Sequence, residues 1–415
     1  MISRIRGTRD ILNTDKLSVL LLIIEQHLEQ YHYTHIILPT IEPLDLFNRA
    51  LGQNTDVVSK EMFLVSSLSP SKERICLRPE ATASTVRAFI ENSIQDLPWK
   101  VFSYGSMFRY ERPQKGRFRE FYQCSMEVIG SKSLSEDVRL ISIIDALFAE
   151  KLQLNEYALH MNYLGCSDDR TIFKKHLYNF LETVSADICK TCTVRKDANI
   201  LRIFDCKNDT CQDAYKNAPH LVQSLCETCD HEWNEIQNRL EELSVSFVYN
   251  PYLVRGLDYY NKTIFEFVSP LLGAQSAFCG GGRYDSLVSM LGGKQDQPAI
   301  GAAIGVDRLL LLLEAVESSV LMSQKDPLYV VMPLAEEQHP VALKVAQKLQ
   351  KAKIVVDVLF EGSVKSMMRK ANKMGARSVI IIGSDEQENN SVMIKNMMTG
   401  ESETVKQLDI LDTLK

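Results

Sequence analysis

The sequence lacks the long apolar runs that membrane-spanning helices require. No run reaches the roughly 18–20 residues of such a helix, and the longest candidate, Leu17 to Ile24, is interrupted by Ser18 and ends at Glu25. The stretch after Met1 has no basic, apolar and small-residue sections typical of a secretory signal, and the chain shows no internal repeats. We therefore expect a cytoplasmic protein with no membrane partner.

An excess of positive charge is also missing. The chain has 47 Lys and Arg against 53 Asp and Glu, a formal net charge of −6. This balance argues against a protein that coats DNA through charge alone, so we expect no DNA partner, but local patches still bind nucleic-acid phosphates. The 415 residues, 45% hydrophobic and 24% charged, are ordinary for a globular protein and exclude disordered and collagen-like classes. The length predicts two to three domains.

Ten cysteines are present without an export signal, which favours reduced thiols or metal ligands over a disulfide framework. Six of them form three pairs, Cys189-x2-Cys192, Cys206-x4-Cys211 and Cys226-x2-Cys229. Such pairs are typical of structural zinc sites, although six thiols exceed one tetrahedral site. The candidate ligands for Zn²⁺ are Cys189, Cys192, Cys226 and Cys229. The alternative is a set of ordinary buried or surface thiols.

The spacing of apolar residues predicts an α+β protein. Helical patterns cover residues 17–31, 135–152 and 306–315, and strand-like runs cover 35–38, 263–268 and 275–279. After the last of these strands we expect a glycine-rich turn that leads through Gly301 to Gly305 into the third helix. Residues 165–243 are helical, charged and cysteine-containing, which indicates an insertion. From Pro327 onward strands and helices alternate, at 328–332, 337–351, 354–358, 364–374 and 378–382, as in an α/β domain.

Residues 101–129 predict two antiparallel strands joined by a basic loop. On the second strand Phe121, Gln123, Ser125 and Glu127 share one face, and the apolar residues take the other. Five cations fall within eleven residues, namely Arg109, Arg112, Lys115, Arg117 and Arg119. Guanidinium groups match phosphate oxygens in pairs, so this cluster favours a polyphosphate ligand over a merely solvated hairpin tip.

Several ordered motifs resemble those of histidyl-tRNA synthetases, a family of class II aminoacyl-tRNA synthetases. Residues 108–119 (FRYERPQKGRFR) resemble motif 2. Residues 253–260 (LVRGLDYY) and 280–285 (GGGRYD) are similar to the two histidine-specific motifs, and residues 301–308 (GAAIGVDR) to motif 3. Weaker similarity covers residues 35–43 (motif 1), 77–82 (LRPEAT, the substrate loop) and 6–10 (RGTRD). The resemblance covers nearly the whole chain.

The resemblance implies a bacterial-type ligase that activates L-histidine with ATP to histidyl-adenylate. The histidyl group is then transferred to the 3′ end of tRNA(His), and AMP and pyrophosphate are released. It implies an antiparallel-sheet catalytic domain at residues 1–320 and an anticodon-binding α/β domain at 327–415. It also implies Mg²⁺ with ATP and a homodimer formed through motif 1. The alternative function is a catalytically inactive, synthetase-like regulatory subunit of histidine biosynthesis, but such paralogues typically lack the anticodon domain and the catalytic arginines.

The resemblance also implies roles for single residues. The catalytic arginines would be Arg109 on the α-phosphate, Arg308 facing the γ-phosphate, and Arg255 bridging the histidine carboxylate and the α-phosphate. Such charges stabilise the anionic transition state without a nucleophilic side chain. ATP would further contact Glu111, Arg117 and Phe121, and Gln114 would lie near the tRNA acceptor end. Histidine would bind to Glu80, Thr82, Gln123, Glu127, Tyr260 and Tyr284.

The chain departs from the usual family pattern at six positions. These are Asn13 for Pro, Ala81 for Gly, Ser106 for Pro, Tyr110 for His, Glu120 for Gln and Tyr122 for His. None removes a proposed catalytic group, but Glu120 adds a negative charge to the ATP hairpin. In the last domain Lys365, Arg369, Lys370 and Lys373 form a basic helix face. It is either a solvated surface or a source of phosphate affinity for tRNA.

Overall fold

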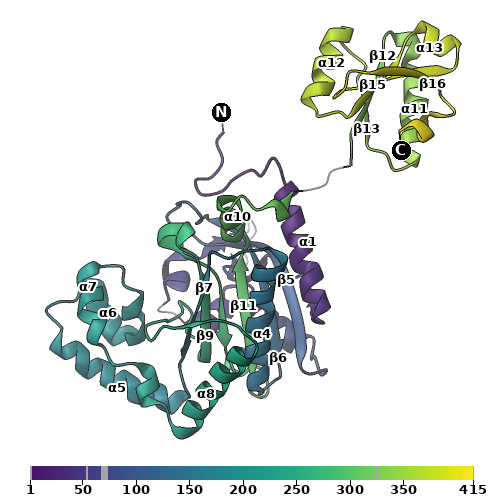
Figure 1. Ribbon diagram of the computed structural model, residues 1–415. Helices are drawn as coiled ribbons and strands as arrows, with labels where there is room; N and C mark the ends of the chain where they lie inside the picture. The colour runs from purple at the N-terminus through teal and green to yellow at the C-terminus, as the bar shows by residue number, and fades with distance from the viewer. Residues whose placement is uncertain (1, 53–54, 67–72, 323–325, 415) are drawn as a thin grey trace. The chain divides into compact units, whose positions relative to one another are not determined.

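The computed structural model describes residues 2–52, 55–66, 73–322 and 326–414. The chain divides into two compact units, Met1–Met322 and Ser323–Lys415 (Figure 1). Each unit has hydrophobic cores of its own. Within the described ranges, no helix is long and apolar enough to cross a lipid bilayer.

The first unit is built on an eight-stranded sheet of order β1-β5-β6-β11-β10-β9-β7-β8. The two edge pairs, β1/β5 and β7/β8, are parallel, and all other neighbours are antiparallel. This antiparallel-dominated sheet confirms the predicted fold class. The strands are β1 (Thr34–His35), β5 (Trp99–Phe108), β6 (Glu120–Ile129), β7 (Ala158–Tyr163), β8 (Val248–Tyr249), β9 (Asn261–Val268), β10 (Ala277–Arg283) and β11 (Ala299–Gly305).

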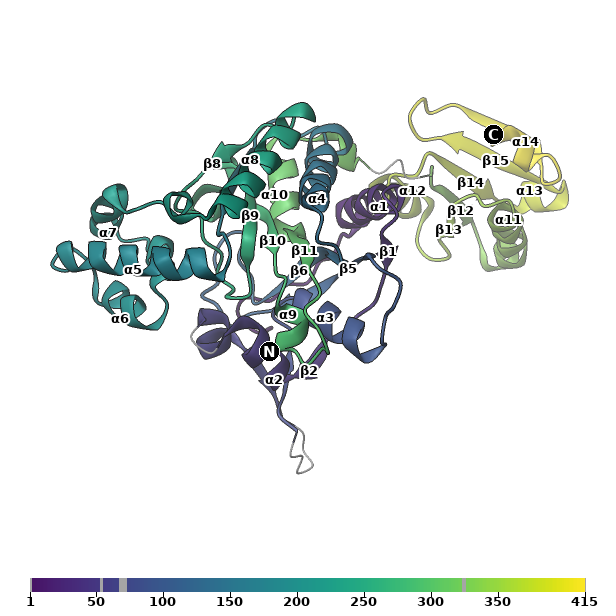
Figure 2. The ribbon, with the colours of Figure 1, turned by 90° about the horizontal axis from the view of Figure 1, so that it is seen from below.

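Helices cover both faces of this sheet (Figure 2). One face carries α1 (Asp15–Gln30), α4 (Leu134–Ala146), α8 (Glu227–Glu242) and α10 (Val306–Ala315). The other carries the shorter α2 (Leu44–Leu51), α3 (Thr82–Glu91) and α9 (Leu287–Met290). The three predicted helices are confirmed as α1, α4 with its continuation η2 (Leu147–Lys151), and α10. The second face is the one that presents the polar residues of β6.

The predicted hairpin is confirmed with its two faces. Gly105 pairs with Gln123, and Val101 pairs with Glu127. Cys124, Met126 and Val128 of β6 point into the core beneath α4 and α10. The alternate residues therefore face the side of α3, because successive side chains of a strand alternate between faces.

The predicted glycine-rich turn is wrong, because both glycine runs are strands. Gly280–Gly282 lie inside β10, and Gly301–Gly305 are part of β11. A Cβ on Gly280 would lie 2.4 Å from Arg255 Nη1, and one on Gly301 would lie 1.5 Å from Glu127 Oε2. The glycines therefore leave room for side chains of neighbouring segments rather than reversing the chain.

The predicted strand at 35–38 is correct only at its start. β1 ends at His35, and the carbonyl oxygens of Leu38 and Pro39 accept hydrogen bonds from the Arg78 guanidinium instead of a neighbouring strand. The chain continues into a small antiparallel sheet of order β2-β4-β3. Its strands are β2 (Ile41–Pro43), β3 (Phe63–Val65) and β4 (Ile75–Leu77), and η1 (Val57–Glu61) precedes β3.

The insertion is helical, as predicted, and α5, α6 and α7 lie at one end of the first unit (Figure 1). Its elements are α5 (Ser167–Thr183), α6 (Lys190–Ala198), η3 (Ile200–Asp205), α7 (Asp209–Ala214), η4 (Tyr215–Asn217) and η5 (Leu221–Ser224), followed by α8. Phe173, Leu177 and Leu181 of α5 pack with Ile203 and Tyr215 in one core cluster. The short helices are thus held against a single long one.

The second unit has a five-stranded sheet of order β13-β12-β14-β15-β16. β12 (Tyr329–Pro333), β13 (Val356–Val358) and β14 (Ser378–Ile382) are parallel and alternate with α11 (His339–Lys351) and α12 (Val364–Lys373), as predicted. The sequence analysis missed the antiparallel pair β15 (Ser391–Asn396) and β16 (Ser402–Lys406). The remaining short elements are η6 (Pro270–Gln275), η7 (Ser319–Leu321), η8 (Glu336–Gln338), α13 (Ser384–Glu388) and α14 (Ile410–Thr413).

Candidate active site

Four arginines from different segments lie close enough for their positive charges to affect one another's pKa. Arg109 follows β5, Arg117 lies in the hairpin loop, Arg255 precedes β9, and Arg308 lies in the first turn of α10. We call these four residues the arginine cluster. Burial, followed by the positive charges of Arg117 and Arg109, lowers the pKa of Arg308 to about 10. Burial likewise lowers the pKa of Arg109, against the opposing effects of Glu61 and Glu80. Mutual repulsion of this kind favours binding of a polyanion.

Backbone carbonyl groups fix two of these side chains. Arg109 Nε donates to Pro79 O at 3.0 Å, and its guanidinium carbon lies 5.3 Å from the centre of the Phe121 ring. Arg308 donates to Gly116 O in the hairpin loop at 3.0 Å and to Ala277 O at 2.7 Å. Arg308 thus links α10, the hairpin loop and the start of β10.

The hairpin loop carries two further predicted residues. Arg117 forms an ion pair with Glu111, which is buried, and its backbone pairs with that of Gln114 across the turn at Gly116. The Gln114 side chain is exposed at this tip. The predicted ATP ligands Glu111 and Arg117 are therefore in mutual contact, and Gln114 is accessible from solvent.

Arg255 lies between the arginine cluster and the tyrosines that follow it in the chain. Burial opposes its charge, but Glu266 on β9 pairs with it and, with the neighbouring tyrosines, raises its pKa. Arg255 Nε is buried without a hydrogen-bond partner. A buried, unpaired guanidinium N–H is costly, so it points to an anionic acceptor that the site receives from a ligand. The sequence analysis missed Glu266, for which no local motif gave a signal.

A second group of polar residues is centred on Glu127, which is 1% exposed. Thr82 donates to its Oε1 at 2.7 Å, and the Tyr284 hydroxyl donates to its Oε2. Burial raises the pKa of Glu127 to about 8, although these two hydrogen bonds lower it. We call Glu80, Thr82, Gln123, Glu127, Tyr260 and Tyr284 the inner pocket. The structure brings Glu127, Thr82 and Tyr284 together from β6, α3 and the end of β10.

Glu80 and Gln123 differ in whether their side-chain oxygens already accept hydrogen bonds. Both oxygens of Glu80 accept backbone N–H groups at the start of α3, from Thr82 at 2.7 Å and Ala83 at 2.8 Å. Burial raises the pKa of Glu80, and these hydrogen bonds and Arg109 oppose that rise. Gln123 Oε1 is buried without a partner. Gln123 therefore offers an open acceptor among the residues of the inner pocket.

Two tyrosines of the inner pocket, Tyr260 and Tyr284, both contact the ring of Tyr259. Tyr260 is 8% exposed, and its ring centre lies 4.6 Å from that of Tyr259. Tyr259 in turn contacts Tyr284 edge to face, with ring centres 5.6 Å apart. The sequence analysis missed Tyr259, although it lies inside the quoted stretch 253–260. Its burial between two predicted residues could not be read from the motif alone.

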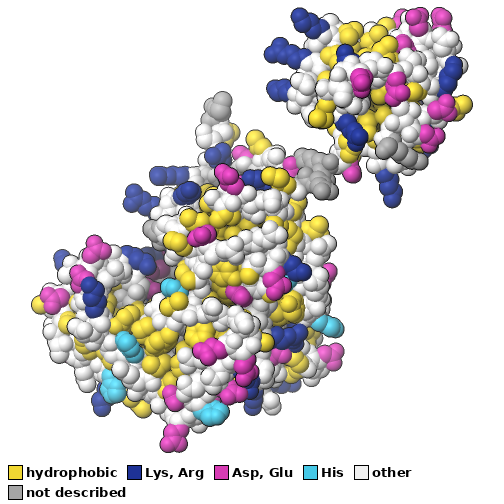
Figure 3. Space-filling view, viewed as in Figure 1, with side chains coloured by type: hydrophobic (Ala, Val, Ile, Leu, Met, Phe, Trp, Pro, Cys, Tyr) yellow, Lys and Arg dark blue, Asp and Glu magenta, His cyan; other side chains and the backbone are white. Residues whose placement is uncertain are grey.

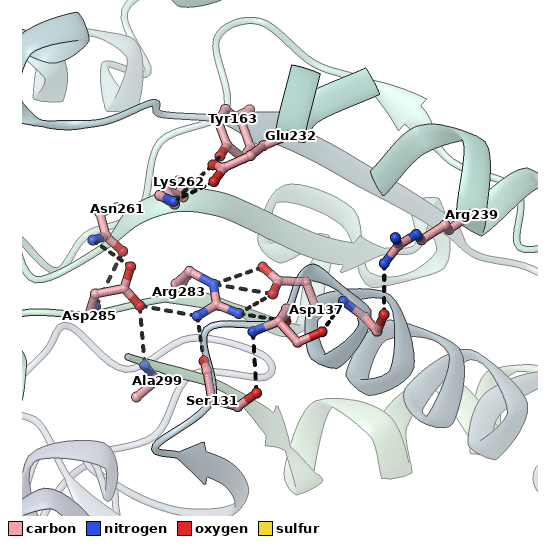
Figure 4. Close-up of polar contacts among 12 residues, drawn as sticks. Ser131, Asp137, Tyr163, Glu232, Arg239, Asn261, Lys262, Arg283, Asp285 and Ala299 are labelled. Carbon is pink, nitrogen blue, oxygen red and sulfur yellow. Dashed lines mark hydrogen bonds and ion pairs between the residues drawn. The ribbon is translucent and has the colours of Figure 1, made fainter. Parts of the chain in front are cut away.

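A buried ion pair holds the end of β10 at Arg283 (Figure 4). Arg283, 2% exposed, pairs with the fully buried Asp137 of α4. Arg283 also donates to Asp285 at 3.2 Å and to the Ser131 carbonyl at 3.0 Å. Removing one partner of such a pair costs about 3–5 kcal/mol because the other charge stays buried. The conformation at residues 283–285 is therefore fixed from the side of α4.

Two departures from the family pattern contact each other. Ser106 of β5 donates to Glu120 of β6 at 3.0 Å. Tyr110, a third departure, has the Arg119 guanidinium 3.7 Å from its ring centre. The extra carboxylate of Glu120 is thus accommodated within the hairpin.

The four cysteines proposed as zinc ligands do not form one group, so that ligand set is wrong. Cys189 and Cys192 lie with Cys206 and Cys211, whereas Cys226 and Cys229 lie with Cys166 and Asp169. Within each group the ligand atoms are within 4.8 Å of one another. Pair spacing along the chain could not reveal this, because it does not determine which pairs meet in the fold.

The basic residues Lys365, Arg369, Lys370 and Lys373 are all exposed on α12 in the second unit. Lys and Arg side chains gather over this helix in the space-filling view (Figure 3). Met367 and Ala371 of the same helix face its core. The face is therefore accessible to a large anionic partner.

Comparisons with known proteins all identify the same family, and the matches together cover nearly the whole chain. Residues 14–309 match the family model described as histidyl-tRNA synthetase, and residues 329–415 match the anticodon binding domain. The histidine–tRNA ligase of Aquifex aeolicus is 41% identical over 410 residues, 98% of each chain. That of Thermodesulfovibrio yellowstonii is 39% identical and covers 100% of this chain and 98% of its own.

The structure is similar to that of the apo histidyl-tRNA synthetase of S. aureus. The TM-score is 0.82 at 29% sequence identity, and the match covers 100% of this chain and 99% of that chain. Together with the two family models and the full-length relatives, this similarity shows that the chain belongs to the histidyl-tRNA synthetase family.

Proposed function

We propose that the chain is a histidine–tRNA ligase that forms histidyl-adenylate from L-histidine and ATP and transfers the histidyl group to tRNA(His). The observation that carries the proposal is the arginine cluster next to the inner pocket, with Arg255 between them. Arg255 lies near the Tyr260 ring, at 5.9 Å from its centre, and its charge acts on Arg109 and Arg308. Arg255 would thereby reach both the carboxylate of histidine and the α-phosphate of ATP.

In the first step the histidine carboxylate attacks the α-phosphorus and pyrophosphate leaves. Negative charge builds on the phosphoryl oxygens, and guanidinium groups in fixed positions stabilise it. Arg109 and Arg255 act on the α-phosphate, and Arg308 and Arg117 act on the departing phosphates. Phe121 stacks on adenine. Glu61 and Glu111, the carboxylates beside Arg109 and Arg117, would be the oxygen ligands for Mg²⁺, which would supply charge neutralisation when bound with ATP.

The inner pocket selects histidine. Glu127 and Tyr260 bind the two imidazole nitrogens, and Glu80, Thr82 and Gln123 surround the ammonium group, for which the Gln123 carbonyl is the open acceptor. Tyr284 fixes the orientation of the Glu127 carboxylate through its hydrogen bond. A site that hydrogen-bonds its substrate rejects analogues lacking those groups by about 10⁴–10⁵-fold. The pocket therefore explains selection without an editing step.

We further propose catalytic and anticodon-binding roles for residues 1–320 and 327–415, and a cytoplasmic homodimer. The exposed Gln114 would contact the tRNA acceptor end, and the basic face of α12 would contact phosphates.

Ile37 is 89% exposed and Ile41 is 55% exposed, both in the segment similar to motif 1. Exposed aliphatic side chains in that segment suit a subunit interface. Sedimentation of the Ile37→Asp variant should show a shift from dimer to monomer.

The test of the proposed function is charging of purified tRNA(His) with labelled histidine in the presence of ATP and Mg²⁺. We expect acid-precipitable label that depends on all three substrates. The regulatory alternative leaves Arg109, Arg255 and Arg308 without a role. Folded protein that binds histidine but charges no tRNA would contradict the ligase and favour that alternative.

A further inference from the structure

Four cysteines of the insertion meet in one place. They come from three short elements: Cys189 directly precedes α6, Cys192 lies in its first turn, Cys206 follows η3, and Cys211 lies in α7. Their sulfur atoms all lie within 4.8 Å of one another. Cys192 and Cys211 are fully buried, and Cys206 is 7% exposed. All four are free thiols.

The spacing of the sulfur atoms suits one metal ion rather than a disulfide. Cys189 Sγ and Cys206 Sγ are 3.9 Å apart. A disulfide requires about 2.05 Å between sulfur atoms. Four thiolates around one tetrahedral Zn²⁺, at Zn–S distances of about 2.3 Å, lie about 3.8 Å from one another. A closed set of four sulfur ligands in tetrahedral arrangement is typical of structural zinc.

The local backbone supports thiolate ligands. Cys189 N donates to Cys211 Sγ at 3.1 Å. Cys189 and Cys192 both lie at the N-terminal end of α6, where backbone N–H groups and the helix dipole stabilise negative charge. Cys192, Cys206 and Cys211 are buried and Cys189 is half-buried, so the group is closed on most sides, as in a structural metal site.

We propose that Cys189, Cys192, Cys206 and Cys211 bind one structural Zn²⁺ that holds the insertion together. α6 and α7 have only 9 and 6 residues. Helices of that length are marginal in isolation, and a bound zinc ion contributes its binding free energy directly to folding. The ion would therefore add to the hydrophobic contacts that hold these short elements against α5.

The same segment supports the loop that carries Arg255. Arg202 of η3, four residues before Cys206, donates to the Gly256 carbonyl and lies 3.9 Å from Asp258. Asn199 donates to Asp258 at 2.8 Å. The metal site thus fixes residues 199–206 against the loop next to Arg255. The proposed effect of this contact on Arg255 rests on the proposed function. The proposed binding of zinc does not depend on that function.

The second group, Cys166, Asp169, Cys226 and Cys229, has a different explanation. The two Asp169 oxygens accept the backbone N–H groups of Cys166 at 3.0 Å and Cys226 at 2.9 Å. Asp169 thereby caps the starts of α5 and α8. Because its oxygens already serve this purpose, the zinc proposal is restricted to the four-cysteine group.

The test is metal analysis of the full chain purified under reducing conditions without chelators. We expect Cys192→Ser and Cys211→Ser each to lose one equivalent of zinc per chain relative to the unaltered protein. Cys76→Ser is the matched control, because Cys76 is equally buried, lies outside both groups, and donates to the Glu42 carbonyl as a serine hydroxyl would. Equal zinc contents in the three variants and the unaltered protein would overturn the proposal.

A second measurement does not depend on how the variants fold. The unaltered protein is depleted of metal and reconstituted with Co²⁺ alone. We expect the intense thiolate-to-cobalt charge-transfer and visible bands of a tetrahedral four-sulfur site, at one Co²⁺ per chain. Unaltered protein that retains neither zinc nor cobalt under reducing conditions would also overturn the proposal. Neither measurement involves histidine, ATP or tRNA, so failure here is distinct from failure of the ligase function.

Discussion

The arginine cluster and the inner pocket lie side by side on one sheet but are built in opposite ways. In the inner pocket Glu127 accepts hydrogen bonds from Thr82 and Tyr284, so the carboxylate is oriented before any ligand arrives. In the arginine cluster, burial and then the neighbouring cations lower the pKa of Arg308 to about 10. The proposed histidine side is thus preformed by internal hydrogen bonds, whereas the proposed nucleotide side would be completed by the charge of its ligand.

The largest effect is expected where the two regions meet. Arg255→Ala should lower the rate of histidine-dependent ATP–pyrophosphate exchange by about 10²–10³-fold, as for loss of one transition-state donor. Histidine binding measured by equilibrium dialysis should change much less. Arg377→Ala, which removes an exposed guanidinium from the second unit, is the control. A similar loss in both variants would contradict the assigned role.

Gly301→Ala tests whether the inner pocket is rigid. Its Cβ would lie 1.5 Å from Glu127 Oε2, so the carboxylate must move. Overpacking of this kind costs about 1–3 kcal/mol, which we expect as a rise of about 10–100-fold in the KM for histidine. Gly305→Ala on the same strand should change KM far less, because its Cβ would meet no atom closer than 3.5 Å. Equal effects would show that the pocket adapts.

We expect Glu127 to make histidine binding depend on pH. Its pKa of about 8 means that free protein holds a proton there at pH 7, and a carboxylate that accepts an imidazole N–H must release it. Affinity should therefore fall as pH decreases below 8, by up to about tenfold per pH unit for one proton. Calorimetry of histidine binding between pH 7 and 8 measures this slope. Glu127→Gln should bind weakly at every pH, and the same slope in that variant would assign the proton elsewhere.

The smallest effect concerns the hairpin of the nucleotide side. Glu120→Gln removes a negative charge that Ser106 contacts near the residues proposed to bind ATP. Since surface substitutions change free energies by about 0.5 kcal/mol, we expect about a twofold lower KM for ATP and no change in the KM for histidine. A rise in the KM for ATP would indicate that the Ser106–Glu120 contact orders the hairpin.

The sequence predicted those features that local patterns determine. The alternation along residues 119–127 predicted the polar face of β6, and apolar spacing predicted α10 at its observed bounds. The sequence analysis failed where contacts between residues far apart in the sequence determine the local structure. Gly280–Gly282 resembled a turn by composition, yet Arg255 and Tyr260 need the space above β10. Glu266 gave no local signal, because its role depends on the Arg255 side chain that reaches it across the site.

The most direct test of the account is ATP–pyrophosphate exchange by the unaltered protein with each of the twenty amino acids in turn. The account predicts exchange with histidine and essentially none with the others, because Glu127 and Tyr260 read the imidazole while the arginine cluster acts on ATP. Equal exchange with several amino acids, or none with histidine from folded protein that binds both substrates, would contradict it.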